Sequence, residues 1–225
     1  MTKRAVLFDL DGTLVDTSRD IAAALNKTLF EYGAPEVSTR TVIAHVGDGP
    51  NELVRGVVPF QLRDRTDEIT ARFLGVYAEI ETEHTRPYPG IVEVLDALRR
   101  AGTPLGIVTN KPERHTGLLL DKLDWASRFE VVLGVDSVGV RKPDPAILRI
   151  ASEKIGVPVE DLIMVGDSKQ DINAATACGM KCIAVSWGFG DPEALSEAGA
   201  NLTAENGEEL ERALLHFVER GDLEV

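Results

Sequence analysis

The stretch VLFDLDGTLVD, residues 6–16, sets the expectations for the whole fold. Its first residues are apolar and partly β-branched, which predicts a short buried strand at residues 4–8. Two carboxylates, Asp9 and Asp11, follow at once, and Gly12 comes next. Like charges at the end of a buried strand are costly unless a cation offsets them. The stretch therefore predicts a strand that ends in a functional site.

Strand-like and helix-like segments alternate along most of the chain. Strands alternating with helices predict an α/β fold, a Rossmann-like parallel sheet with helices on both faces. Short apolar runs predict strands at residues 4–8, 104–109, 131–133, 162–165, 181–185 and 201–202. Apolar spacing and end signals predict helices at residues 19–32, 39–45, 51–58, 63–83, 91–101, 114–123, 145–155, 169–178 and 208–220.

The alternation stops after the first strand and resumes only after the Arg86–Gly90 segment, RPYPG. The region between has helical periodicity and no strand signal, which predicts an all-helical cap domain inserted into the sheet domain. We expect residues 1–15 and 87–225 to form the Rossmann-like core, and residues 16–86 to form the cap.

The amino-acid composition limits the classes of protein to which the chain can belong. The 225 residues are 44% hydrophobic and 27% charged, which is ordinary for a globular protein, and no apolar run approaches the roughly 18 residues of a membrane helix. The N-terminal MTKR leads into a strand rather than a signal peptide. Two cysteines, Cys178 and Cys182, are too few for a disulfide framework, so we expect them reduced and buried in a cytoplasmic protein. The net charge of −13 argues against nucleic acid as a partner but leaves a small anionic substrate open.

Four polar clusters follow predicted strands. Asp9 follows the first, Thr109-Asn110-Lys111 another, and Gly166-Asp167-Ser168 a third, while Lys142 lies in the loop GVRKPDP. Because sites in open α/β sheets lie beyond the carboxyl ends of the strands, we expect these clusters to meet at one edge.

The carboxylates in these clusters suit phosphoryl chemistry. Asp9 and Asp167 offer the oxygen ligands that Mg²⁺ prefers, and Asp9 is a candidate nucleophile. Asp11, two residues on, is a candidate acid and base for the leaving group and for water. Asp171, with its neighbour Ser168, is expected to support the site from behind by holding Lys142 or a metal-bound water.

The other members of the clusters suit an anion. Gly12 lets the backbone turn and bring its N–H group close to a phosphate. Thr109 and the N–H group of Asn110 are candidate phosphate ligands. Lys142 supplies positive charge for Asp9 and for the incoming phosphate.

These motifs together resemble a known family. DLDGT (residues 9–13), TN (109–110), GVRKPDP (139–145) and GDSxxD (166–171) resemble, in order, the four motifs of the haloacid dehalogenase-like hydrolase superfamily. The resemblance implies a Mg²⁺-dependent phosphomonoesterase with Asp9 as nucleophile and Asp11 as acid and base. It implies metal binding by Asp9, the Asp11 carbonyl and Asp167, and a phosphoryl grip by Thr109 and Lys142.

Shorter segments resemble one subgroup. HVGDGP (residues 45–50) and SWGFG (186–190) are similar to segments of phosphoglycolate phosphatases, which makes His45, Gly47 and Gly49 candidate substrate-binding residues. Arg55 is a further candidate for a substrate carboxylate. Asp11 favours phosphoesters over haloacids, because true dehalogenases lack this second aspartate.

Several alternatives stay open at this point. A pyrophosphatase, or a sugar-phosphate phosphatase or mutase, shares the same motifs. A phosphate-binding or phospho-relay module would use the strand-end aspartate, but has no use for Asp11 or a cap. We expect a small-molecule phosphate ester as substrate, no nucleic acid or membrane partner, and a monomer or homodimer.

Overall fold

A computed structural model describes residues 3–80 and 82–223 of the chain. In this part, six parallel strands form the central sheet, in the order β5-β4-β1-β6-β7-β8. β1 lies between β4 and β6, and its residues are fully buried. The predicted parallel sheet is confirmed. The strands are β1 (Ala5–Phe8), β4 (Leu105–Val108), β5 (Val131–Leu133), β6 (Leu162–Gly166), β7 (Lys181–Val185) and β8 (Leu202–Ala204).

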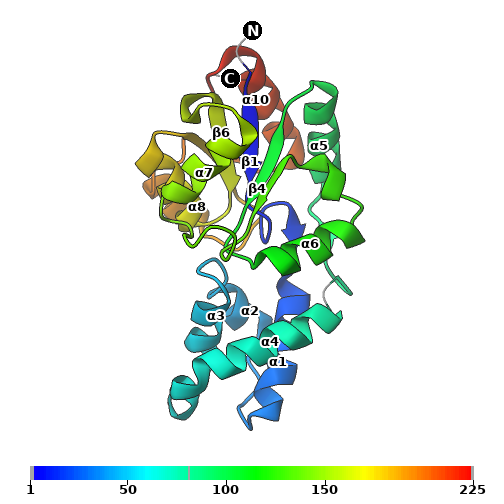
Figure 1. The fold of residues 1–225 in the computed structure, drawn as a ribbon, viewed down its shortest axis with the longest axis vertical. Coiled ribbons are helices and arrows are strands. Elements are labelled where there is room, and N and C mark those ends of the chain that lie inside the picture. Colours follow the sequence, from blue (N-terminus) through cyan, green and yellow to red (C-terminus); the bar gives the residue numbers. More distant parts are fainter. Residues whose placement is uncertain (1–2, 81, 224–225) are drawn as a thin grey trace.

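Helices cover both faces of this sheet, as Figure 1 shows. Apolar side chains of α5, α6 and α10 pack on one face, and those of α7, α8 and α9 pack on the other. Two buried cores therefore sandwich the strands. The helices are α5 (Ile91–Arg100), α6 (Glu113–Lys122), α7 (Ala146–Ile155), α8 (Lys169–Cys178), α9 (Pro192–Glu197) and α10 (Gly207–Arg220), with short 3₁₀ turns η2 (Ala126–Arg128) and η3 (Val159–Asp161).

The segment after β1 forms the helical cap that the sequence predicts. It has an apolar core of its own, to which α1 and α4 contribute Leu25, Leu29, Ile69 and Phe73. Figure 1 shows these helices beyond the lower end of the sheet, with α1 alongside α4. The elements are α1 (Ser18–Glu31), α2 (Thr39–Ile43), α3 (Pro50–Val57), η1 (Phe60–Arg65) and α4 (Thr66–Ile80).

The two connections between the cap and the sheet run side by side. β2 (Val15–Asp16) and β3 (Arg86–Pro87) pair as an antiparallel ribbon. Strands of two residues leave no periodicity in a sequence, so this ribbon was not expected. The division into a core of residues 1–15 and 87–225 and a cap of residues 16–86 stays a prediction, and its boundaries fall at this ribbon.

A buried aspartate fastens the end of the cap to its beginning. Asp20, in the first turn of α1, accepts hydrogen bonds from the N–H groups of His84 (2.9 Å) and Thr85 (2.8 Å) and from the Thr85 hydroxyl (2.7 Å). Burial alone would raise the pKa of Asp20, but these hydrogen bonds hold it below its usual value. The charged form of Asp20 therefore stabilises the folded ribbon region.

Two predicted features differ in the structure. The helix expected at residues 63–83 begins as the 3₁₀ turn η1 and becomes α-helical only at Thr66, where Asp67 and Glu68 complement the helix dipole. It ends by Ile80, and Thr82 has a left-handed φ of 83°, which a helix to residue 83 does not allow. Cys182 is buried as expected, but Cys178 is only half-buried. No helix in the described part of the chain is long and apolar enough to cross a membrane.

Candidate active site

The carboxyl end of β1 is the centre of the site. Asp9 continues the sheet by one hydrogen bond, from its N–H group to the Val165 carbonyl (2.9 Å), and it is 7% exposed. The chain then turns sharply, and the Leu10 carbonyl accepts hydrogen bonds from the three N–H groups of residues 13–15. Asp11 therefore comes from a tight turn rather than from an extended strand. The turn nevertheless keeps Asp9 and Asp11 facing the same cavity.

Gly12 is required by the close packing of this turn. Its φ of 87° lies in the left-handed region, and a Cβ atom at this position would stand 2.2 Å from Oδ2 of Asp167. Any side chain here would displace the Asp167 carboxylate. The predicted role of Gly12 in phosphate binding stays a prediction, but its need for a bare backbone has a direct structural cause.

Lys142 brings a positive charge to Asp9. Its Nζ atom lies 3.0 Å from Oδ1 of Asp9 and 2.6 Å from Oδ1 of Asp171, and it donates to the Val108 carbonyl at 2.6 Å. The side chain is only 1% exposed. Burial alone would lower the pKa of Lys142, but the two carboxylates raise it above its usual value. The lysine is therefore a fixed cation next to the proposed nucleophile.

Asp171 and Ser168 hold this lysine in place. At the start of α8, Ser168 caps the helix, and its N–H and hydroxyl groups both donate to Oδ2 of Asp171 (3.0 and 2.6 Å). This leaves Oδ1 of Asp171 for Lys142. The arrangement is the one expected of residues that support the site from behind.

Three buried carboxylates gather at this edge of the sheet. Asp9, Asp167 and Asp171 each place an oxygen within 4.8 Å of the others. Asp167 accepts hydrogen bonds from the Thr13 hydroxyl (2.8 Å) and the Phe189 N–H group (2.7 Å). Burial, followed by the charges of Asp9 and Asp171, raises the pKa of Asp167 to about 8.

A divalent cation fits this cluster. The contact of Asp9 Oδ1 with Lys142 is an ion pair by distance but lacks hydrogen-bond geometry, so this buried oxygen accepts no hydrogen bond from the described residues. Three carboxylates face the single ammonium of Lys142, so a divalent ion would balance their charge. Asp9 and Asp167 offer hard oxygen donors for it: each Asp167 oxygen accepts one hydrogen bond from a neutral group, whereas Asp171 gives one oxygen to the Lys142 ammonium and the other to two donors of Ser168.

Thr109 and Asn110 follow β4 at the same edge, as predicted. Thr109 is buried and lines the cavity. The Asn110 side chain has a role that the sequence did not reveal. Its Oδ1 atom accepts from the Lys142 N–H group (3.0 Å), and its Nδ2 atom donates to the carbonyls of Lys142 (2.9 Å) and Gly47 (2.7 Å). One amide thus joins the lysine loop to the cap.

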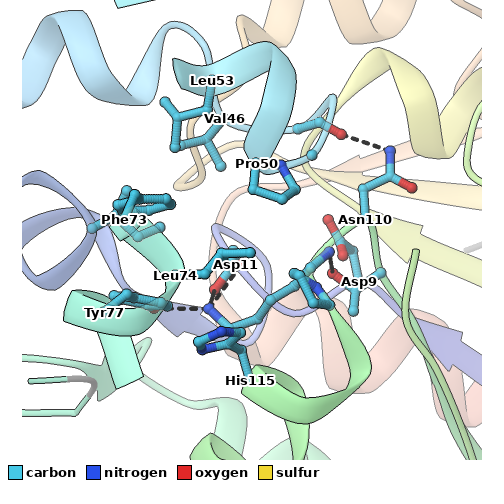
Figure 2. A pocket seen from close by; sticks show the side chains of 16 residues that line it. Asp9, Asp11, Val46, Pro50, Leu53, Phe73, Leu74, Tyr77, Asn110 and His115 are labelled. Atoms are coloured by element: carbon cyan, nitrogen blue, oxygen red, sulfur yellow. Dashed lines mark hydrogen bonds and ion pairs between the residues drawn. The ribbon is translucent and has the colours of Figure 1, made fainter. Parts of the chain in front are cut away.

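A cavity lies between the cap and the edge of the sheet, and Figure 2 shows its lining. The space open to the centres of water-sized molecules is about 60 Å³, which suits a small ligand. Gly47 and Gly49 line it, as expected of the Gly-rich cap segment. Their loop touches the core, since Asp48 accepts from the Gln170 amide (2.7 Å) and from Arg141.

Two cap candidates lie outside this lining. The His45 ring packs against Gly56, and its Nδ1 atom lies 2.9 Å from the Thr41 carbonyl. The Arg55 side chain belongs to an exposed position of α3. The structure thus brings the glycines of the predicted cap segment to the cavity, but not His45 or Arg55.

Three lining residues were given no role from the sequence. Lys111 Nζ lies 3.3 Å from Oδ1 of Asp11 and donates to the Tyr77 hydroxyl at 2.7 Å, and the His115 ring stacks on Tyr77. Lys111 could have been found from its place directly after Thr109 and Asn110. Tyr77 could not, because in sequence it is one more apolar-face residue of a long helix.

Comparison with known proteins gives consistent results. The haloacid dehalogenase-like hydrolase family matches residues 6–185. Phosphoglycolate phosphatase 1 of Pseudomonas aeruginosa is 35% identical over 209 residues, which cover 90% of this chain and 76% of that protein. A phosphoglycolate phosphatase of Neisseria meningitidis is 39% identical over 202 residues, which cover 88% and 86% of the two chains. The crystal structure of a predicted phosphoglycolate phosphatase from Haemophilus somnus superposes with a TM-score of 0.87 at 27% identity, covering 94% of this chain and 98% of that one.

Proposed function

The chain belongs to the haloacid dehalogenase-like hydrolases and is a phosphoric monoester hydrolase, and we propose that its substrate is phosphoglycolate or a closely similar small ester. We further propose that the phosphoryl group passes through Asp9 and that Mg²⁺ is the cofactor. The observation that carries the proposal is the meeting of Asp9, Lys142 and Asp167 at the edge of the sheet, where Asp9 lines a small cavity under the cap.

Asp9 and Asp167 would hold the Mg²⁺ ion, joined by the Asp11 carbonyl as the family resemblance implies. When bound, the ion would neutralise phosphoryl oxygens and allow two buried carboxylates to stay ionised. The carboxylate cluster supports this assignment, because one lysine alone leaves it short of positive charge.

In the first half-reaction, an Asp9 oxygen attacks the phosphorus and the bond to the leaving oxygen breaks. Asp11 gives its proton to that oxygen, so the alcohol departs neutral. Lys142 stays charged throughout and offsets the negative charge on the phosphoryl oxygens. The Thr109 hydroxyl, at the end of the neighbouring strand, would donate a hydrogen bond to one of the same oxygens.

In the second half-reaction, water attacks the phosphorus of phospho-Asp9, and Asp11 takes its proton. The bond between Asp9 and phosphorus breaks, which releases phosphate and restores both aspartates. The cap encloses the cavity during these steps, which keeps bulk water away from the intermediate and leaves room only for a small leaving group.

A substrate panel tests the proposed specificity. Wild-type enzyme with Mg²⁺ is expected to show a kcat/KM for phosphoglycolate at least about tenfold higher than for a hexose phosphate or pyrophosphate, because the small cavity disfavours a hexose and the carboxylates of Asp9 and Asp11 disfavour the extra charge of a phosphate leaving group. The measurement is phosphate release at matched enzyme concentration. A higher kcat/KM for pyrophosphate or the hexose phosphate would contradict the proposal.

Asp167→Asn tests the cation site without relying on activity. In the wild type, Mg²⁺ at about 100 times its Kd should stabilise the fold by about 2.7 kcal/mol, seen as a higher Tm. The variant should lose most of this shift. Without metal, the variant should be more stable than the wild type near neutral pH by about 2 kcal/mol, because a neutral amide avoids the cost of protonating or ionising the buried carboxyl group.

The pH dependence of this difference has a definite sign. The folded pKa of Asp167 lies above its usual 3.8, at about 8, so the folded state binds the proton more tightly than the unfolded state. Metal-free wild type should therefore lose stability as the pH rises through this window, and the variant should lose less. The exposed change Asp121→Asn serves as the control. An unchanged Mg²⁺ shift in Asp167→Asn would contradict the assignment.

A further inference from the structure

The cavity contains a lysine that the proposed mechanism leaves unused. The Lys111 side chain is only 4% exposed and lines the cavity together with Asp11 and Tyr77, which Figure 2 labels. A buried ammonium loses its hydration, so it is retained only where negative or polar groups compensate it. The groups that compensate the Lys111 ammonium in the cavity are therefore informative about its role.

Contacts from separate parts of the fold fix the position of this ammonium. Lys111 follows β4, and its Nζ atom lies 3.3 and 3.4 Å from the two carboxylate oxygens of Asp11, in the turn after β1. The same atom donates to the hydroxyl of Tyr77, on α4 of the cap, at 2.7 Å and lies 4.4 Å from the ring centroid. The Lys111 ammonium thus lies between Asp11, the proposed acid, and the cap.

This position faces the leaving group. In the proposed reaction Asp11 protonates the leaving oxygen, so that oxygen lies within hydrogen-bond reach of the Asp11 carboxylate. Lys111 is the immediate neighbour of that carboxylate. A group two or three bonds beyond the leaving oxygen therefore comes within reach of the ammonium.

The positive charge of Lys111 lies opposite a mostly apolar lining that comes from the cap. The cap contributes apolar side chains, among them Val46, Leu53 and Phe73. Among the described lining residues, Lys111 carries the permanent positive charge, and His115, stacked on Tyr77, is the other basic side chain. An apolar leaving group would add no acceptor to those that Asp11 and Tyr77 already give this ammonium, whereas a carboxylate would add a second negative partner.

We propose that Lys111 is a specificity-determining residue that binds the carboxylate of the leaving group and thereby selects acidic phosphate esters over neutral esters of the same size. This inference rests on the proposed function and deepens it. Tyr77 positions the ammonium from the cap, so the contact forms when the cap covers the cavity. The small volume limits the acid to a few heavy atoms beyond the phosphate.

The test compares phosphoglycolate with phosphoglycolamide, in which an uncharged amide replaces the carboxylate. Lys111→Met should lower kcat/KM for phosphoglycolate about 100-fold, because a charge-assisted hydrogen bond is lost. For the amide the loss should be about tenfold at most, from the lost contact to Asp11. Lys111→Arg should restore most of the preference for the acid. The exposed Lys154→Met is the matched control for a lost charge.

The outcomes separate this inference from the proposed function. Equal losses for both substrates in Lys111→Met would overturn the inference while leaving a wild-type preference for phosphoglycolate intact. A wild type that does not prefer the acid over the amide would also overturn the inference, whereas a wild type that prefers a hexose phosphate or pyrophosphate to both would overturn the proposed function. If Lys111→Met does not fold, Tyr77→Phe takes its place and should lower the acid-to-amide ratio about threefold. An unchanged ratio in Tyr77→Phe would then overturn the inference.

Discussion

Asp9→Asn is expected to reduce kcat by about 10⁴-fold or more, because an amide oxygen is a poor nucleophile toward phosphorus. The variant keeps the shape of the side chain, so the hydrogen bond from its N–H group to Val165 should persist. The measurement is steady-state hydrolysis of p-nitrophenyl phosphate with Mg²⁺, together with acid trapping of phosphoenzyme from a labelled substrate. Wild type should yield trapped phosphoprotein, and Asp9→Asn should yield none.

Two controls make this result specific. Asp121→Asn changes an exposed carboxylate of α6 and should keep the activity of the wild type. Asp11→Asn should also lose turnover, yet retain Asp9 as an acceptor, so trapped phosphoprotein distinguishes the two positions. A stable phosphoprotein without turnover in the wild type would favour a phospho-relay over a hydrolase. Residual turnover in Asp9→Asn above about a thousandth of the wild-type rate would contradict a nucleophilic role.

Lys142→Met should cost both stability and activity. The ammonium is buried between Asp9 and Asp171, so its removal leaves two buried carboxylates without their counter-charge. We expect a loss of about 3–5 kcal/mol in the free energy of unfolding and a fall of about 10³-fold in kcat. Chemical denaturation and steady-state kinetics in the presence of Mg²⁺ measure the two effects.

A double variant identifies the cause. Adding Asp171→Asn to Lys142→Met should recover about 1–3 kcal/mol relative to the sum of the single changes, because the two residues are in contact. The raised pKa of Lys142 fixes the pH window: its contribution is complete below the usual value of 10.5 and is lost as the pH rises through the higher folded value. The cost should therefore be constant around neutrality. A loss below about 1 kcal/mol in the free energy of unfolding of Lys142→Met is no more than a surface ion pair contributes, and it would contradict a structural role for this buried ammonium.

The sheet could be read from the sequence because its signals are local. Buried parallel strands are short apolar runs, and the predicted 131–133 and 181–185 agree with β5 and β7. The helix at 169–178 agrees with α8, which a Ser168 cap and Gly179 delimit. Helix α9 was missed although Asp191 caps it and Pro192 occupies its first turn. That error came from overlooking a local signal.

The residues of the site also divide into those that the sequence could place and those that it could not. Asp9, Asp167 and Lys142 could be placed together because strand ends in a parallel sheet meet at one edge. The cap could not be read in this way, since the rotation of each helix about its axis decides which side chain reaches the cavity. That is why Tyr77 was missed, and why His45 was expected in the lining but packs on Gly56 instead.

The Asn110 side chain couples the position of the cap to that of the Lys142 loop. Its Nδ2 atom donates to the Gly47 carbonyl of the cap loop and to the Lys142 carbonyl, and its Oδ1 atom accepts from the Lys142 N–H group. Lifting the cap would break the hydrogen bond to Gly47, and we expect this to leave the Asn110 side chain, and with it the Lys142 backbone, less firmly held. Under the proposed function, this coupling would disfavour attack by solvent, because the cap position that admits bulk water would also be the one in which Lys142 is least firmly held.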